Sequence, residues 1–224
     1  MQIFGGNSRK VADVDGAFSG VIVSKRPNGS NGSYRLAAKT GLLIGVAAAS
    51  ASAGHIFALR NAASSPSVYM LIRYLRLRWQ TVTAFTTEQQ IGLKAFLTRA
   101  YSASHGGGTA LDKTAAGGFR KLASMPQSSL TDARIATTGA LTNGTHTIDA
   151  QEFLELIGFS QTGAAPAVTT QPFADYDARN ADVHPIVLSQ NEGLIIANSV
   201  AMGAAGTAVV SVEMDWDEVT SYPY

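Results

Sequence analysis

The chain has 224 residues, of which 46% are hydrophobic and only 15% charged, and its formal net charge is +1. This composition favours a folded domain over a disordered chain, and the small basic excess argues against binding nucleic acid through its phosphates. Cysteine is absent, which excludes disulfide bonds and thiolate metal ligands.

Residues 1–33 are predicted to form an N-terminal arm, and residues 34–224 the main domain. Pro27 and two Asn-Gly pairs mark residues 27–32 as a linker. Ile3-Phe4 and the segment FSGVIV (18–23) are short and strand-like, with no partner in their immediate sequence. We expect the arm to reach a neighbouring subunit and add a strand there, with the interface residues Phe18, Val21, Ile22 and Val23. The alternative is that FSGVIV is the first strand of its own sandwich.

No secretion signal or membrane span is expected. The segment MQIFGGNSRK lacks the basic-then-apolar order of a signal peptide. The most apolar stretch, residues 41–57, is mostly Ala, Ser and Gly and falls short of the roughly 20 strongly apolar residues of a membrane helix.

The middle of the chain predicts two long strands. Residues 67–83 alternate in hydrophobicity, so that one face carries Tyr69, Leu71, Leu75, Leu77 and Trp79, with Arg73 interrupting it. Of Arg73, Arg76 and Arg78, we expect two to point to solvent and one to pair with an acid. Residues 86–104 fit a helical stripe or a strand, and Gly92 favours the strand. The loop at 104–110 lacks the lysine of a phosphate-binding loop and is predicted to be a turn.

The second half predicts more strands and one short helix. Asn143-Gly144 is a strong turn signal and predicts a hairpin over residues 132–149. Residues 149–158 are predicted as a helix, capped by Asp149 and ended by Gly158. A polar loop (160–185) precedes a closing hairpin, in which residues 193–203 and 207–219 are joined by a turn. Together these elements predict an all-β fold: an antiparallel β-sandwich or jelly roll with one short helix and an N-terminal arm.

Four carboxylates crowd into residues 213–218, and they match the acidic signature Glu-x-Asp-x-x-Glu of a jelly-roll glycoside hydrolase family. Acids two apart on a strand lie about 7 Å apart, within the range that sugar hydrolysis uses. However, strand alternation alone places Val210, Val212, Met214 and Trp216 on one side and Ser211, Glu213, Asp215 and Asp217 on the other. The acids are therefore predicted to be the polar face of a strand, where charge also prevents edge aggregation. We expect no catalytic residue and no enzyme.

Metal and cofactor sites are not expected. The segment DYDARNADVH (175–184) departs from the EF-hand pattern at Arg179 and Asn180, and it is predicted to be a solvated loop. A calcium site of another kind is the alternative, with the oxygen donors Asp175, Asp177 and Asp182. The four histidines are scattered along the chain without a metal-binding spacing, at His55, His105, His146 and His184.

Several blocks resemble a group of virion structural proteins of tailed bacteriophages. They are IFALRNAASS, VYMLIRYLRLRWQTVTAFT, GGGTALDKT, ARIATTGALTNGTHTIDAQ and HPIVLSQNEGLIIANSVAMGAAGTAVVSVEMDWDEV. NEGLII and VSVEMDWDEV are the most telling of these, and the resemblance spans about residues 34–219. It implies an all-β shell component, such as a capsid decoration (cement) protein or a neighbouring head or tail component. It carries no site residues over to this chain.

Two functions follow as expectations. The first is a non-enzymatic decoration protein, assembled in the host cytoplasm, that sits on the capsid surface and clamps capsomers of the major capsid protein, as a homotrimer. The absence of cysteine suits a reducing cytoplasm. The alternative is a carbohydrate-binding or adhesion module of a phage tail or head fibre. Its sugar-stacking residues would be Tyr34, Tyr69, Tyr74, Tyr101 and Tyr176, although ordinary burial would place them in the core or an interface.

Overall fold

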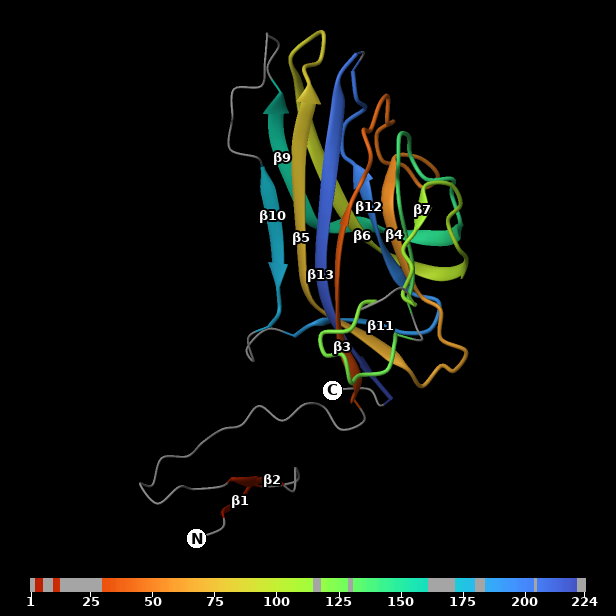
Figure 1. Cartoon of the computed structure of the whole chain (residues 1–224), viewed down its shortest axis with the longest axis vertical. Coiled ribbons are helices and arrows are strands. Elements are labelled where there is room, and N and C mark those ends of the chain that lie inside the picture. Colours follow the sequence, from red (N-terminus) through yellow and green to blue (C-terminus); the bar gives the residue numbers. More distant parts are fainter. Residues whose placement is uncertain are drawn as a thin grey trace.

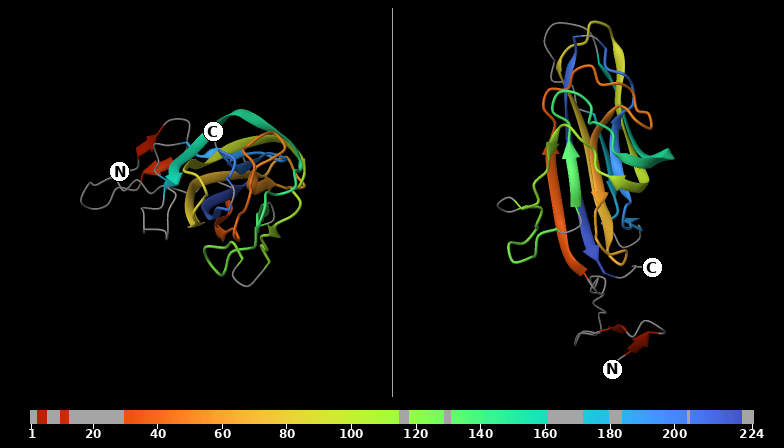
Figure 2. Two further views of the ribbon diagram at one scale, coloured as in Figure 1. Left: turned by 90° about the horizontal axis from the view of Figure 1, so that it is seen from above. Right: turned by 90° about the vertical axis from the view of Figure 1, so that its right-hand side faces the viewer.

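The computed structural model describes residues 3–5, 10–12, 30–114, 118–128, 131–160, 172–179, 184–203 and 205–220. Over these residues the chain forms strands and loops but no helix. No helical segment of the described chain is therefore long and apolar enough to cross a membrane. Two antiparallel sheets pack face to face (Figures 1 and 2), and the predicted all-β sandwich is confirmed.

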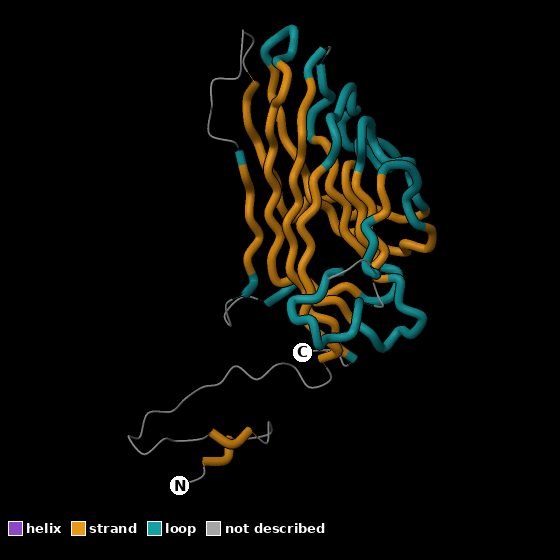
Figure 3. Tube along the Cα trace, in the orientation of Figure 1, coloured by secondary structure: helices purple, strands orange, loops and turns teal. Residues whose placement is uncertain are grey.

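The two sheets contain eleven strands of very different length among the described residues, and the tube in Figure 3 shows strands and loops alone. The first sheet has the order β10 (Phe173–Asp177), β5 (Tyr69–Thr83), β13 (Thr207–Val219) and β3 (Ser30–Lys39), and β11 (Ile186–Leu188) also pairs with β5. The second sheet has the order β7 (Thr109–Ala110), β8 (Thr131–Ile135), β4 (His55–Asn61), β12 (Gly193–Asn198), β6 (Gln89–Ala103) and β9 (Thr145–Ser160).

The N-terminal arm contains a small ribbon of its own. Strand β1 (Ile3–Gly5) pairs with β2 (Lys10–Ala12), and Phe4 lies opposite Val11. The expectation that Ile3-Phe4 has no partner in its immediate sequence is therefore wrong. The segment 18–23, with the predicted interface residues Phe18, Val21, Ile22 and Val23, lies outside the described residues.

The core lies between the two sheets, and β13 fills it as its alternation predicts. The side chains of Val210, Val212, Met214 and Trp216 are buried, whereas Ser211, Glu213, Asp215 and Asp217 stay partly exposed. Removing the large apolar side chains from water is the main driving force for closing the sandwich.

Strand β5 changes faces at Arg73. Along β13, Asp215 lies opposite Tyr74 and the next residue, Trp216, lies opposite Ile72, so that Arg73 is an extra residue in the ladder. Leu75, Leu77 and Trp79 reach the core as predicted, but beyond the bulge Met70 and Ile72 do so as well. A one-residue bulge moves the following side chains to the other face, and the prediction of one uniform face was wrong for this reason.

The predicted helix at 149–158 is part of the strand β9. Leu154 and Leu156 lie opposite Ala95 and Leu93 of β6, and Lys94 pairs with Glu152 at 2.9 Å. A helix of ten residues is marginal by itself, whereas the edge of β6 offers this segment a ladder of backbone hydrogen bonds. The tertiary contact therefore overrides the local helix signals, and the prediction was wrong.

Both predicted hairpins are also wrong. Strand β8 pairs with β4 and β7, whereas β9 pairs with β6, so residues 132–149 connect two distant strands. Strand β12 lies between β4 and β6 and is buried throughout, whereas β13 belongs to the opposite sheet. The chain therefore passes from one sheet to the other between Asn198 and Thr207. The predicted polar loop at 160–185 contains β10, which pairs with β5.

Candidate functional sites: an acidic strand and a buried histidine cluster

The outward carboxylates of β13 are all engaged in ion pairs with basic side chains of the same chain. The pairs are Glu213 with Arg78 (3.4 Å), Asp215 with Lys121 (2.9 Å) and Asp217 with Arg73 (3.0 Å). Such partly exposed pairs contribute little to stability each. The three acids are therefore partners in a row of ion pairs on the outer face of the first sheet.

Glu218 differs from the other three acids because it points into the protein and is only 1% exposed. Its Oε1 accepts hydrogen bonds from the Ser128 hydroxyl (2.5 Å) and from Trp216 Nε1 (3.2 Å). Burial and the nearby Glu218 charge raise the pKa of Tyr34, which stacks on Trp216, to about 12. Glu213 and Glu218 therefore lie on opposite sides of β13, and they do not form the facing pair of carboxylates that sugar hydrolysis requires.

The arginines of β5 are more fully paired than expected. Arg76 donates two hydrogen bonds to Asp175 of β10, at 2.7 and 2.6 Å, and Arg73 and Arg78 are paired as described above. One of these three arginines was expected to pair with an acid, but all three do, while their side chains stay partly exposed. The hydrogen bond from Arg76 lowers the pKa of Asp175 below its usual range.

The alternative calcium site finds little support in this geometry. Arg179 donates to Asp177 (Nε to Oδ1, 2.9 Å) and lowers the pKa of that carboxyl to about 2. Two of the three proposed oxygen donors, Asp175 and Asp177, are thus already bound by arginines. The third, Asp182, lies outside the described residues.

The tyrosines proposed for sugar stacking are mostly inside the protein. Tyr34, Tyr74 and Tyr101 are 1%, 8% and 2% exposed, and Tyr69 and Tyr176 are partly buried. Three of the five are thus buried and are not exposed for stacking on a sugar.

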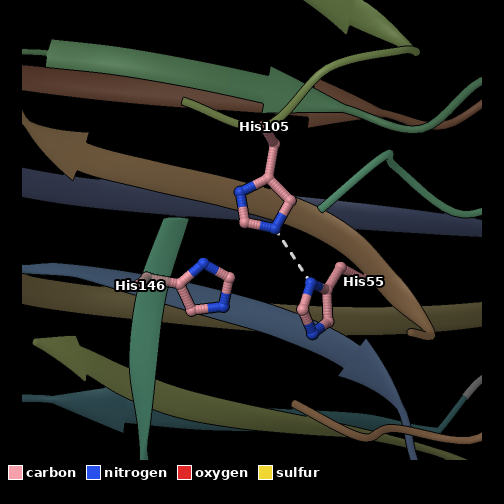
Figure 4. A group of neighbouring side chains, drawn as sticks. All are labelled: His55, His105 and His146. Carbon is pink, nitrogen blue, oxygen red and sulfur yellow. Dashed lines mark hydrogen bonds between the residues drawn. The ribbon is translucent and has the colours of Figure 1, made fainter. Parts of the chain in front are cut away.

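Three of the four histidines, scattered along the sequence, converge in space. Figure 4 shows the rings of His55, His105 and His146 gathered around a common point. One ring nitrogen of each lies within 4.8 Å of those of the other two, and the ring centroids are 5.0 to 5.5 Å apart. We call these three residues the histidine cluster; His184 is not part of it.

The strands of the second sheet bring the cluster together. His55 opens β4, His146 is the second residue of β9, and His105 follows the end of β6. Ala100, with φ of 48°, marks an irregular turn of backbone near the end of β6. A bridge between Gly106 and Thr142 then joins the segment after β6 to the segment before β9.

Hydrogen bonds orient two of the three rings. His55 Nδ1 and His105 Nε2 are 2.8 Å apart, and His55 Nε2 lies 3.0 Å from the carbonyl oxygen of Ser50. The hydroxyl of Tyr101 contacts His105 Nδ1. In contrast, both ring nitrogens of His146 are buried without a hydrogen-bond partner among the described residues.

The surroundings of the histidine cluster favour the neutral form of each ring. Burial lowers the pKa of His55 and of His146, and burial together with the two neighbouring rings lowers the pKa of His105 to about 3. A neutral imidazole can act as a hydrogen-bonding group or as a metal ligand. No spacing in the sequence indicated the cluster, because the three histidines stand far apart, at positions 55, 105 and 146.

A comparison of the chain with protein-family models, with curated proteins and with solved structures finds no match. Function must therefore be inferred from the residues and the geometry of this chain.

Proposed function

We propose that this protein is a non-enzymatic structural component of a bacteriophage virion, a decoration protein that bridges capsomers on the surface of the head. The resemblance of its sequence blocks to virion proteins supports this role. So does the engagement of the acidic strand in ion pairs and core hydrogen bonds, because these carboxylates then have a structural purpose.

The observation that carries the proposal is a pair of exposed apolar side chains on β9, the outer strand of the second sheet. Ile157 and Phe159 are 59% and 61% exposed, and they share one face because they lie two residues apart on the strand. We call these two residues the edge patch. Large apolar side chains grouped on a surface are typical of a protein–protein interface.

Strand β9 and the neighbouring β10 both lie at the ends of their sheets. Among the described residues, β9 pairs only with β6, and β10 pairs only with β5. They lie side by side in Figures 1 and 3, and an edge-to-face contact between Phe153 and Tyr176 (5.9 Å) connects them. An outer strand offers backbone groups to which a strand of another chain can add.

The sheet order supports a head-to-tail contact between copies. The arm enters the sandwich through β3, and β3 and β10 stand at opposite ends of the first sheet. The arm of one copy, with Phe18, Val21, Ile22 and Val23, would lie on the edge patch of the next. Contacts of this kind generate a closed ring when the rotation permits, in agreement with the proposed homotrimer on the major capsid protein.

Imaging of intact particles, with mass spectrometry of purified heads, tests the proposed function. We expect many copies of the protein on the outer surface of the head, at positions where capsomers meet. Its location in the tail, or its absence from purified virions, would refute the decoration role.

The double substitution Ile157→Asp with Phe159→Asp tests the edge patch. Burial of each side chain contributes about 1.5 to 3 kcal/mol, and about 1.4 kcal/mol is tenfold in affinity. We therefore expect the double variant to have at least about tenfold lower oligomer affinity than the original protein. Its oligomer should dissociate at protein concentrations at least about tenfold higher than those at which the original oligomer dissociates, as measured by light scattering after gel filtration. Leu122→Asp is the matched control, because Leu122 is 54% exposed outside the patch. Equal dissociation of both variants would exclude the edge patch as the interface.

A further inference from the structure

We propose that His55, His105 and His146 form a binding site for a divalent transition-metal ion, with zinc as the expected metal. Each imidazole would contribute one ring nitrogen, and a fourth position would be taken by water. This inference does not depend on the proposed function.

The first argument is the way in which two of the rings are held. His55 directs Nδ1 toward the centre of the cluster, while its Nε2 donates to the carbonyl oxygen of Ser50 at 3.0 Å. His105 directs Nε2 toward the centre, while its Nδ1 meets the hydroxyl of Tyr101. A metal-binding histidine typically has this arrangement, in which the distal nitrogen is fixed by a carbonyl or another polar group.

The second argument comes from assigning the protons without a metal. The carbonyl of Ser50 can only accept, so His55 carries its proton on Nε2, and its Nδ1 must accept. His105 then donates from Nε2, and its Nδ1 accepts from Tyr101. This chain of hydrogen bonds is complete without His146.

His146 is therefore the residue that a metal-free cluster does not explain. Both of its ring nitrogens are buried without a partner among the described residues, although its ring lies 5.0 Å from that of His105 and 5.5 Å from that of His55. A buried polar group without a partner is costly. An ion at the centre of the cluster would give one nitrogen of His146 a ligand bond, and it would replace the direct contact between His55 and His105.

The donor set determines the class of metal. Three neutral imidazoles suit zinc, copper, nickel or cobalt ions. Calcium and magnesium require oxygen ligands, and within the described residues the cluster includes no carboxylate. Three protein ligands with one open position is a common zinc arrangement.

A bound ion would join parts of the second sheet that are distant in the sequence. His55 and His105 are 50 residues apart, and His146 lies on a third strand. An ion that binds only the folded chain stabilises it by mass action.

The test uses the full-length protein after treatment with a chelator, titrated with zinc chloride alone. We expect one zinc ion per chain by calorimetry. At a free zinc concentration about 100 times the dissociation constant, the melting temperature should rise by about 5 to 10 °C. Cobalt chloride should give visible absorption bands of a four-coordinate ion.

His146→Gln is the decisive variant. It should lower zinc affinity at least about 100-fold, because it removes a ligand. Loss of a residue that only supports a ligand typically lowers metal affinity by about 10-fold to 100-fold. Without metal it should melt within about 2 °C of the original protein, because His146 makes no hydrogen bond there. His184→Gln is the matched control and should bind zinc unchanged.

Two results would overturn the metal site. One is the absence of any zinc-dependent change in the original protein, and the other is unchanged zinc binding by His146→Gln. If that variant does not fold, zinc-soaked crystals of the original protein decide by anomalous scattering. A peak among the three rings supports the site, and no peak there excludes it.

Discussion

Deletion of residues 1–27 is expected to leave a folded sandwich that no longer forms its oligomer or binds the capsid. Strand β3 begins at Ser30 and pairs with β13 along its length, so this cut leaves intact every sandwich strand that the structure describes. The chain loses only the arm with its apolar segment 18–23. Gel filtration, circular dichroism and binding to undecorated heads measure the outcome.

The size of the effect follows from the arm itself. A flexible linker of about seven residues has a root-mean-square reach of about 13 to 16 Å, enough to cross to an adjacent subunit. Burial of four apolar side chains contributes a few kcal/mol at about 25 cal/mol per Å², before the cost of ordering the arm. In a closed ring every copy gives one arm and receives one, and the simultaneous contacts multiply. We therefore expect a loss of at least about 100-fold in oligomer affinity.

A matched variant separates the arm from the alternative. Serine at Phe18, Val21, Ile22 and Val23 keeps the arm at full length but removes its apolar surface, and it should abolish assembly as the deletion does. If either variant fails to fold, the segment FSGVIV is instead a strand of its own sandwich. Normal assembly of both variants would also contradict the proposed role of the arm.

Glu218→Ala is expected to destabilise the protein by about 3 kcal/mol, whereas Glu213→Ala should cost less than about 1 kcal/mol. The two residues belong to the same acidic stretch of β13. Glu218 is buried and accepts from Ser128 and Trp216, whereas the Glu213 side chain is 36% exposed and pairs with Arg78. Loss of Glu218 leaves the indole N–H of Trp216 buried without its acceptor.

Urea unfolding of the two variants, followed by Trp fluorescence, measures this difference. Glu218→Gln serves as a further control, because its amide oxygen can still accept both hydrogen bonds. It should fall between the original protein and Glu218→Ala. Equal costs for the two alanine variants would mean that the buried hydrogen bonds of Glu218 contribute nothing.

Local pattern was enough to predict the all-β class and the faces of β13. Alternation of Val210, Val212, Met214 and Trp216 with polar residues has the period of a strand, and a half-buried strand needs no further information. The same alternation correctly gave the outward side of Glu213, Asp215 and Asp217. Glu218 was expected on the polar face with the other acids, and that prediction was wrong, because its side chain is buried.

Local pattern failed where two structures fit equally well. Phe153, Leu154 and Ile157 make a helical stripe, but Leu154 and Leu156 also alternate, and only the pairing of β9 with β6 decides between them. Turn signals show where the chain reverses, but not which strands then pair. Thus β12 and β13 were expected in one hairpin and lie in opposite sheets.

The histidine cluster depended on tertiary structure most of all. By itself, the sequence determined that this chain folds as strands, with few charged residues overall and without cysteine ligands. It holds His55, His105 and His146 far apart, with no spacing that indicates a common site. Only the order of β4, β6 and β9 in the second sheet, with the turn after β6, brings the three rings to one point. The physical reason is that side-chain periodicity acts over a few residues, whereas strand order is set by the packing of the whole core.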